Sequence, residues 1–175
     1  KTSQMLSLFF ATSLFFAAAH AATERLCTIS DVRGVEDAAS LHSCTSMNFQ
    51  FEQLSASEQA AVGAALPDSS VSVLLYRSSQ IGASIEALAQ AAIDSPQLEV
   101  LTVREEALGV AGSVALARVL SAEGGALRSL DLRQSELSAE GGATLAEALR
   151  NNSALEILNL LGNGLGEVGA AAVAG

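Results

Sequence analysis

The chain has 175 residues, the usual size of a single domain, so several independent domains are not expected. Nineteen acidic residues against nine Lys and Arg give a formal net charge of -10, and a surface of that sign repels nucleic acids and anionic membranes. Half of the residues are hydrophobic, which excludes intrinsic disorder, whereas aromatic residues make up only 4%. The sequence therefore predicts one folded unit with an aliphatic core and no nucleic-acid partner.

Residues 1–21 have the pattern of a secretory signal peptide. Lys1 precedes an apolar run from Leu6 to Ala19, and the small residues of Ala19-His20-Ala21 suit signal peptidase. Cleavage after Ala21 would remove one Lys and no acidic residue, which changes the net charge from -10 to -11. A buried helix or a membrane anchor is the alternative, but a bilayer span needs about 20 apolar residues. We therefore expect a protein without a membrane span, secreted or held at the extracellular face of the cell surface.

Both cysteines, Cys27 and Cys44, lie near the start of the predicted mature chain. In an oxidising compartment we expect them to form a disulfide, which would stabilise the fold by about 3 kcal/mol in the chain-entropy model. A metal site is not expected, because His42 is the only histidine that remains after cleavage. Residues 22–43 do not fit the repeat that follows, and we predict that they form an N-terminal cap on it.

Residues 44–175 repeat with a period of 27 to 29 residues. Each unit reads L-x-x-L-x-L-x-x-N-x-L, followed by about 12 residues of Ala-rich helical pattern, which predicts a strand, a turn and a helix. Five consecutive units, the last of them truncated, begin at Cys44, Val71, Leu98, Leu127 and Leu155. Because the chain starts with Lys and stops inside the fifth helix, we expect it to be a fragment.

The predicted strands lie near residues 47–50, 73–77, 100–104, 129–133 and 157–161. The predicted helices lie near residues 55–66, 83–93, 110–121 and 139–150. Ser55 and Glu58 form the capping box that opens the first helix, and Pro67 ends it. Pro96 follows the second helix in the same way.

These units resemble the leucine-rich repeats of the ribonuclease-inhibitor type, most specifically in the segment LRSLDLRQSELSAEGGATLAEALRNNSALEILNLLGNGLGEVGAAAVA. The resemblance implies an α/β fold: a curved solenoid with a parallel sheet on the concave face and helices on the convex face. It also implies protein binding. The turn asparagine of the repeat is present only as Asn163, so we expect looser turns in the earlier units. The residues at the equivalent positions are Glu52, Ser79, Glu106 and Ser135.

One motif suggests a cofactor. Gly164-x-Gly166-x-x-Gly169 matches the dinucleotide-binding pattern after a predicted strand, but the acidic ribose ligand would lie beyond Gly175. We assign these glycines to packing and expect no cofactor, because they recur in the earlier units. Gly166 matches Gly109 and Gly82, and Gly169 matches Gly141 and Gly112.

Catalytic motifs are absent from the sequence: it contains neither G-x-S-x-G nor H-E-x-x-H. Glu105 and Glu106 should point to opposite faces at the end of a strand, at a solvated rim and in a turn, which does not favour an acid/base pair. The hypothesis is a non-enzymatic protein-recognition module. The alternatives are an inhibitor or regulator of a secreted enzyme and a structural spacer in a longer surface protein. Asn151-Asn152-Ser153 is in addition a glycosylation sequon, with Asn151 as the acceptor.

The candidate binding site is a row of arginines on the concave face. Side chains alternate along a strand, so the residue after the third apolar position of each unit should face outward. Arginine side chains suit carboxylate or phosphate groups, and we predict a protein partner with an acidic patch. The alternative is internal neutralisation by Asp131 and Glu105, which would make the row an ordinary solvated face. The predicted site consists of Arg77, Arg104 and Arg133, with Thr102, Asp131 and Asn159 beside them.

Overall fold

The computed structural model of the chain describes residues 25–28, 41–51 and 53–174. The predicted signal peptide and most of the predicted cap lie outside the described residues. Within those ranges the strands are β1 (Leu26–Cys27), β2 (Ser46–Gln50), β3 (Val73–Arg77), β4 (Val100–Arg104), β5 (Ser129–Asp131) and β6 (Ile157–Asn159). The helices are α3 (Ala56–Ala65), the 3-10 helix η3 (Ile81–Ser84), α4 (Ile85–Ile93), α5 (Gly109–Ser121), α6 (Ser138–Leu149) and α7 (Gly166–Ala174).

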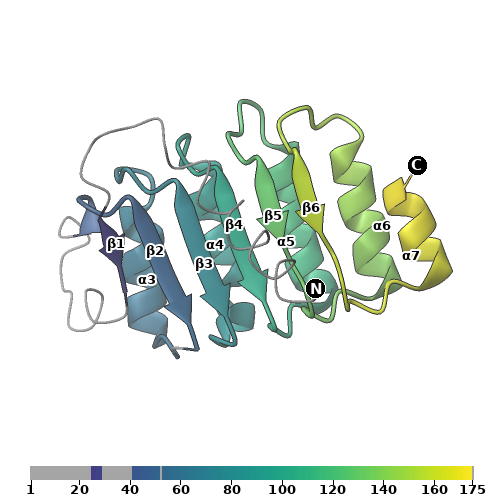
Figure 1. Cartoon of the computed structure of the whole chain (residues 1–175), viewed down its shortest axis with the longest axis horizontal. Coiled ribbons are helices and arrows are strands. Elements are labelled where there is room, and N and C mark those ends of the chain that lie inside the picture. Colours follow the sequence, from purple (N-terminus) through teal and green to yellow (C-terminus); the bar gives the residue numbers. More distant parts are fainter. Residues whose placement is uncertain (1–24, 29–40, 52, 175) are drawn as a thin grey trace, which may run out of the picture.

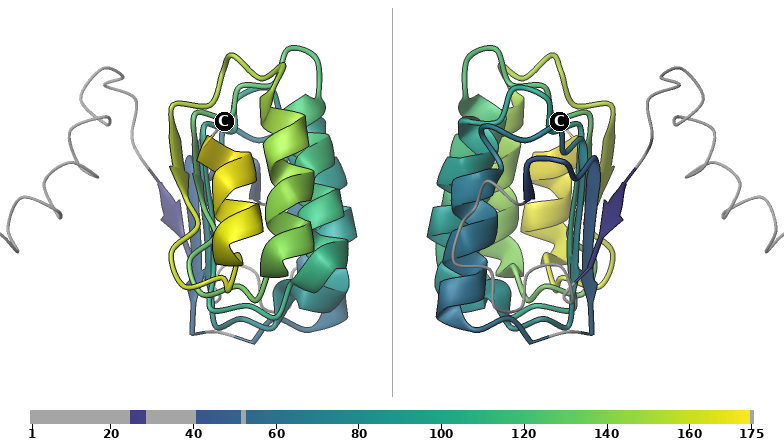
Figure 2. Two further views of the ribbon diagram at one scale, coloured as in Figure 1. Left: turned by 90° about the vertical axis from the view of Figure 1, so that its right-hand side faces the viewer. Right: turned by 90° about the vertical axis from the view of Figure 1, so that its left-hand side faces the viewer.

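The strands form one six-stranded parallel sheet, in the order in which they occur along the chain. Parallel neighbours need a crossover connection, and from β2 onward a helix lies between each strand and the next (Figure 1). Figure 2 shows that the α-helices all pack on the same face of the sheet. The other face carries no described helix and is called the open face below. The α/β prediction is therefore confirmed as a two-layer arrangement of sheet and helices.

The core lies between the two layers. In β2 and β3 the second and fourth residues are buried and the others are half-buried, which is the period of two expected for a strand with one covered face. Leu74, Leu101 and Leu130 occupy the same register position in successive strands, and each is fully buried. The rings of Phe49 and Tyr76 pack together inside this layer, with centroids 5.2 Å apart and planes tilted by 41°. Alternating apolar residues thus determine which face of the sheet the helices cover.

The predicted element positions are close to the observed ones, with three differences. The helix predicted at 83–93 begins earlier, as the 3-10 turn η3, and continues as α4. The last two strands end two residues before the predicted ends, at Asp131 and Asn159. The strand β1 was not predicted; it lies inside the range assigned to the cap and pairs with β2. The capping box of Ser55 and Glu58 is present at the start of α3.

The glycines of the helical segments have two different roles. Gly141 lies against Ser113 of α5, and a Cβ atom on Gly169 would lie 3.2 Å from the backbone of Ala139 in α6. The packing prediction is right for these two positions. It is wrong for Gly109 and Gly166, which have φ angles of +58° and +59° and no neighbour within 4 Å of a Cβ. A left-handed backbone at the start of a helix, where a side chain would be strained, explains these two glycines.

Cys27 and Cys44 are joined by a disulfide, as the sequence predicted, with their Cα atoms 5.8 Å apart. Both residues are fully buried, and Cys27 lies in β1. The bond therefore connects the first strand to the segment that leads into β2.

Candidate interaction surface

The open face is organised by the strand register. Arg77 pairs with Arg104 across β3 and β4, and Thr102 pairs with Asp131 across β4 and β5. Arg133 lies two residues beyond Asp131, so the three arginines follow one another across neighbouring strands. Their side chains are 31% to 35% exposed, in contrast to the fully buried leucines on the other face. The structure thus brings together the three arginines that the sequence singled out, here called the arginine row.

Arg77 is paired with Glu105. Its Nε donates to Oε1 of Glu105 at 2.8 Å, and its Nη2 lies 2.6 Å from the same oxygen. The Ser78 hydroxyl donates to Oε2 at 2.8 Å. The hydrogen bonds from Arg77 and Ser78 lower the pKa of Glu105 below its ordinary value. Glu105 is therefore ionised at neutral pH and neutralises Arg77.

Arg104 and Arg133 share a single carboxylate. Oδ2 of Asp131 lies 2.5 Å from Nη2 of Arg104 and 3.0 Å from Nη2 of Arg133, and Nε of Arg133 donates to Oδ1 at 3.1 Å. Burial by itself would raise the pKa of Asp131, but hydrogen bonds from both arginines outweigh burial and lower it. Nε of Arg104 is buried without a hydrogen-bond acceptor. One negative charge therefore serves two guanidinium groups.

The arginine row is only partly neutralised. Both carboxylates proposed for internal pairing do make ion pairs with it, as the alternative interpretation required. Two carboxylates against three guanidinium groups nevertheless leave one positive charge, centred on Arg104 and Arg133. In a chain of net charge -10 this is a local reversal of sign on the open face. An anionic group on a partner would complete the pairing.

The other two predicted site residues contribute less. Thr102 is only 5% exposed, in the middle of the sheet between its register partners Leu75 and Asp131. Asn159 is half-buried, and its Oδ1 accepts a hydrogen bond from the backbone N–H of Leu161 at 3.2 Å. Asn159 can therefore reach a partner only with its remaining amide group, and Thr102 is a packing residue of the face.

A series of left-handed residues follows the strands. Ser78, Glu105 and Gln134 have φ angles between +50° and +57°, and Gly162 occupies the next equivalent position with +76°. A non-glycine residue with positive φ is uncommon and is favoured only where neighbouring structure holds it. Backbone hydrogen bonds from Ser78 to the Arg104 carbonyl and from Glu105 to the Arg133 carbonyl provide that support. The turn brings the Glu105 carboxylate to Arg77.

Phe51 was not identified from the sequence. It has a left-handed backbone, with φ of +62°, and it is 63% exposed. The guanidinium carbon of Arg77 lies 4.6 Å from the centre of its ring, within the range of a cation–π contact. At the opposite end of the arginine row, Leu161 is 72% exposed. The feature that could have identified both is their position: each is a large apolar residue at the end of a strand, in or beside the outward-facing column.

Beneath the row, the turns are held by buried polar side chains. Oδ1 of Asn163 accepts from the backbone N–H of Ser135 at 2.8 Å, and its Nδ2 donates to the Leu132 carbonyl at 2.6 Å. Glu106 replaces asparagine two units earlier and accepts from the N–H groups of Ser79 at 2.5 Å and of Ile81 at 3.0 Å. The looser turn expected at Glu106 is not what the structure has, because a longer carboxylate reaches the same kind of donors.

Glu106 is 3% exposed, whereas the side chain of Glu105 is 29% exposed, so the two adjacent acids point to opposite sides as predicted, with Glu105 at the rim and Glu106 in the turn. Burial raises the pKa of Glu106, although the N–H groups of the preceding turn oppose the shift. Burial, reinforced by the charge of Glu106, also raises the pKa of Tyr76. Glu106 is therefore enclosed in the structure of the turn and is not available for chemistry on the open face.

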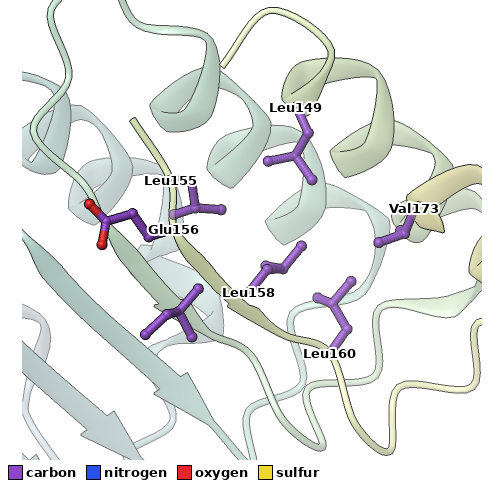
Figure 3. Close-up of a pocket in the computed structure, with 7 residues that line it drawn as sticks. Leu149, Leu155, Glu156, Leu158, Leu160 and Val173 are labelled. Atoms are coloured by element: carbon purple, nitrogen blue, oxygen red, sulfur yellow. The ribbon is translucent and has the colours of Figure 1, made fainter. Parts of the chain in front are cut away.

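A second feature is an apolar recess at the C-terminal end, with a volume of about 340 Å³ (Figure 3). Figure 3 shows Leu158 and Leu160 pointing into it from the last strand and the segment after it, with Leu149 and Val173 on the facing helices. Leu158 and Leu160 are half-buried, whereas Leu130 and Leu132, their equivalents one unit earlier, are fully buried.

Asn151, the predicted glycosylation site, is exposed in the turn after α6. The next residue, Asn152, is anchored by a 2.6 Å hydrogen bond from its Nδ2 to the Leu120 carbonyl. The Asn151 side chain is accordingly accessible, and the adjacent backbone is fixed.

No protein-family model matches the chain, and no curated protein matches it. Within the described ranges, His, Cys, Asp and Glu side chains form no group of three that could hold a metal ion. The helices in those ranges are all too short or too polar to cross a membrane.

Proposed function

We propose that the chain is a leucine-rich repeat solenoid of the ribonuclease-inhibitor type that acts as a non-enzymatic protein-recognition module. Two observations support the repeat assignment. A strand, a turn and a helix recur every 27 to 29 residues, and the strands stack side by side in chain order. The buried Asn163 also hydrogen-bonds the backbone of the preceding turn, as the asparagine of such a repeat does. In a solenoid of this kind the open face is the concave face.

The observation that carries the recognition proposal is the incomplete pairing of the arginine row. Three neighbouring guanidinium groups lie on the open face, which carries no helix of the described residues, and share two carboxylates. Arginines so placed are suited to forked hydrogen bonds with carboxylates of a partner protein. The pairing within the row fixes the side chains in position, which lowers the entropy lost on binding.

The proposed location is outside the cell, in a secreted protein or at the cell surface. The apolar leader of residues 1–21 supports this location, and so does the disulfide, because such bonds persist in oxidising compartments. The sequon at Asn151, exposed in the structure, fits the same route.

The experiment that tests the proposal is selection from a displayed library of random peptides on the purified protein. The comparison protein carries Arg77→Ser, Arg104→Ser and Arg133→Ser together. We expect selection on the natural sequence to enrich peptides rich in Asp and Glu, and the triple variant to lose them. The matched control is Arg118→Ser, which removes an arginine of α5 that pairs with Glu86 away from the open face.

Circular dichroism must show that the triple variant keeps its secondary structure. Enrichment of the same acidic peptides by the triple variant would overturn the assignment of the site. Turnover of a substrate by the purified protein would overturn the non-enzymatic assignment.

A further inference from the structure

The arginine row lies between two exposed apolar side chains. Phe51 follows β2 and is 63% exposed, and Leu161 follows β6 and is 72% exposed. Exposed large hydrophobic residues are few in the described part of the chain, and the other three are Leu26, Val114 and Ile157. Neighbouring strands are about 4.8 Å apart, so the four steps from β2 to β6 place the two apolar ends about 19 Å apart.

Phe51 is held where a partner can reach it. The backbone N–H of Phe51 donates to the Arg77 carbonyl at 2.7 Å, which fixes the strained left-handed residue at the end of the strand. The Arg77 guanidinium stacks on the ring and is itself held by Glu105. Phe51 therefore has a strained backbone that is already fixed and a large aromatic ring that is exposed. Such a side chain loses little freedom on binding, which is typical of an anchor position in an interface.

The dimensions match an extended peptide segment that crosses the strands. An extended chain rises about 3.3 Å per residue, so six steps cover about 20 Å, close to the distance from Phe51 to Leu161. Because alternate residues face the same side, the first, third, fifth and seventh residues of such a segment would face the sheet. Measured from the end at Phe51, the third and fifth residues of the peptide would lie about 6.6 and 13 Å along it. On the same scale, Arg77, Arg104 and Arg133 lie at about 5, 10 and 14 Å.

We propose that the partner of the open face is an extended acidic segment with two apolar anchors six residues apart. One anchor packs on Phe51 and the other on Leu161, and acidic residues at the third and fifth positions pair with the arginine row. The first acid lies between Arg77 and Arg104, and the second lies beside Arg133. This inference rests on the proposed function and adds to it the length, the spacing and the apolar character of the partner.

The test uses fluorescein-labelled synthetic peptides and fluorescence anisotropy with the purified protein. The first peptide has the core Leu-Ser-Glu-Ser-Glu-Ser-Leu, and the second has the same composition with adjacent leucines, Leu-Leu-Ser-Glu-Ser-Glu-Ser. We expect the first peptide to bind at least tenfold more tightly than the second. Both affinities should fall as the salt concentration rises, because the central contacts are between charges.

Variants separate the anchors from the charges. Phe51→Asn keeps a residue that accepts a left-handed backbone, and with Leu161→Ser it should abolish the advantage of the first peptide. Arg104→Gln with Arg133→Gln should weaken both peptides. Val114→Ser is the matched control, because Val114 is an exposed apolar residue of α5 and should have no effect. Each variant must keep the thermal midpoint of the natural sequence.

The possible results distinguish the two-anchor inference from the acidic-partner site on which it rests. Equal affinity for both peptides that still depends on the arginines would overturn the two-anchor inference and leave the acidic-partner site standing. Binding that the arginine substitutions do not change would overturn both. Absence of binding by either peptide at millimolar concentration would also overturn the inference.

Discussion

The two ends of the sheet differ in how they are covered. At the N-terminal end, β1 pairs with β2, the Arg25 carbonyl accepts hydrogen bonds from Thr45 and Ser46, and the disulfide between Cys27 and Cys44 is fully buried. At the C-terminal end, β6 leaves its outer edge beside the apolar recess, and Ile157 is 59% exposed. The edge strand is thus fixed at the N-terminal end of the sheet and incompletely buried at the C-terminal end.

The difference shows that burial in this fold comes from the neighbouring unit. Leu130 and Leu158 are equivalent residues on adjacent strands, yet Leu130 is fully buried and Leu158 is half-buried. In stacked repeats, stability is close to a sum of terms within units and between neighbours, so a unit with one neighbour lacks one of them. The contribution of a leucine should therefore depend on its place in the stack.

The largest effect is expected from truncating equivalent leucines. Leu130→Ala leaves a cavity in a fully enclosed site and should lower the free energy of unfolding by about 4 kcal/mol. Leu158→Ala should cost about half as much, because part of that side chain is already in contact with solvent. Urea denaturation followed by circular dichroism measures both values. Equal losses would show that the C-terminal end is as well covered as the interior.

Reduction of the disulfide should have the next largest effect. Cys27 and Cys44 are 17 residues apart, and opening a loop of that size costs about 3 kcal/mol in the chain-entropy model. The thermal midpoint should fall when a phosphine reductant is added. The variant with Cys27→Ser and Cys44→Ser should start lower and not respond to the reductant. An unchanged midpoint of the natural protein would show that β1 adds nothing to the N-terminal end.

A smaller loss is expected at the last turn. Asn163→Ala removes the acceptor of the Ser135 N–H and the donor to the Leu132 carbonyl, both buried, which should cost about 2 kcal/mol. Asn159→Ala is the control, because its side chain accepts only from Leu161 and lies on the open face. Equal denaturation midpoints for the two variants would contradict a structural role for Asn163.

The smallest effect is expected in the pH dependence of stability. Glu106 can titrate in its turn, whereas Asn163, at the equivalent position of the last turn, cannot. Burial raises the pKa of Glu106 above the ordinary value of 4.5, so in that pH range the folded state binds more protons than the unfolded state. Stability should therefore fall as the pH rises from 4.5 through the folded-state pKa. Glu106→Gln should flatten this slope, whatever its effect on absolute stability. Denaturation midpoints measured at several pH values provide the test.

The acids of the open face have pKa values shifted in the opposite direction to that of Glu106, so they serve as an internal comparison. The pKa values of Asp131 and Glu105 lie below the ordinary 3.8 and 4.5, so their stabilisation is lost as the pH falls through the lowered values. The two effects lie on opposite sides of the ordinary carboxyl range. If stability increased from pH 4.5 to neutral, and if Glu106→Gln left this pH dependence unchanged, the result would contradict the burial of the Glu106 carboxylate.

The sequence by itself determined the strand and helix positions, because their causes are local or periodic. Apolar residues at alternate positions, Leu74 with Tyr76 and Leu101 with Val103, fixed the covered face of β3 and β4, and the capping box at Ser55 fixed the start of α3. Repetition made the parallel order of strands predictable, since the units have similar lengths of 27 to 29 residues and the same apolar positions. The disulfide followed from there being only two cysteines.

Only the tertiary structure decided which polar groups meet. Asp131 is shared by Arg104 and Arg133, and Glu105 turns onto Arg77 through a left-handed backbone. Arg77 and Glu105 are 28 residues apart, and Arg104 and Asp131 are 27 apart, so the repeat places these groups on neighbouring units but does not decide which carboxylate pairs with which arginine. The apolar pattern that selects the covered face is present in each unit alone, whereas ion pairing depends on distances of a few ångströms between units, which exist only once the strands have stacked.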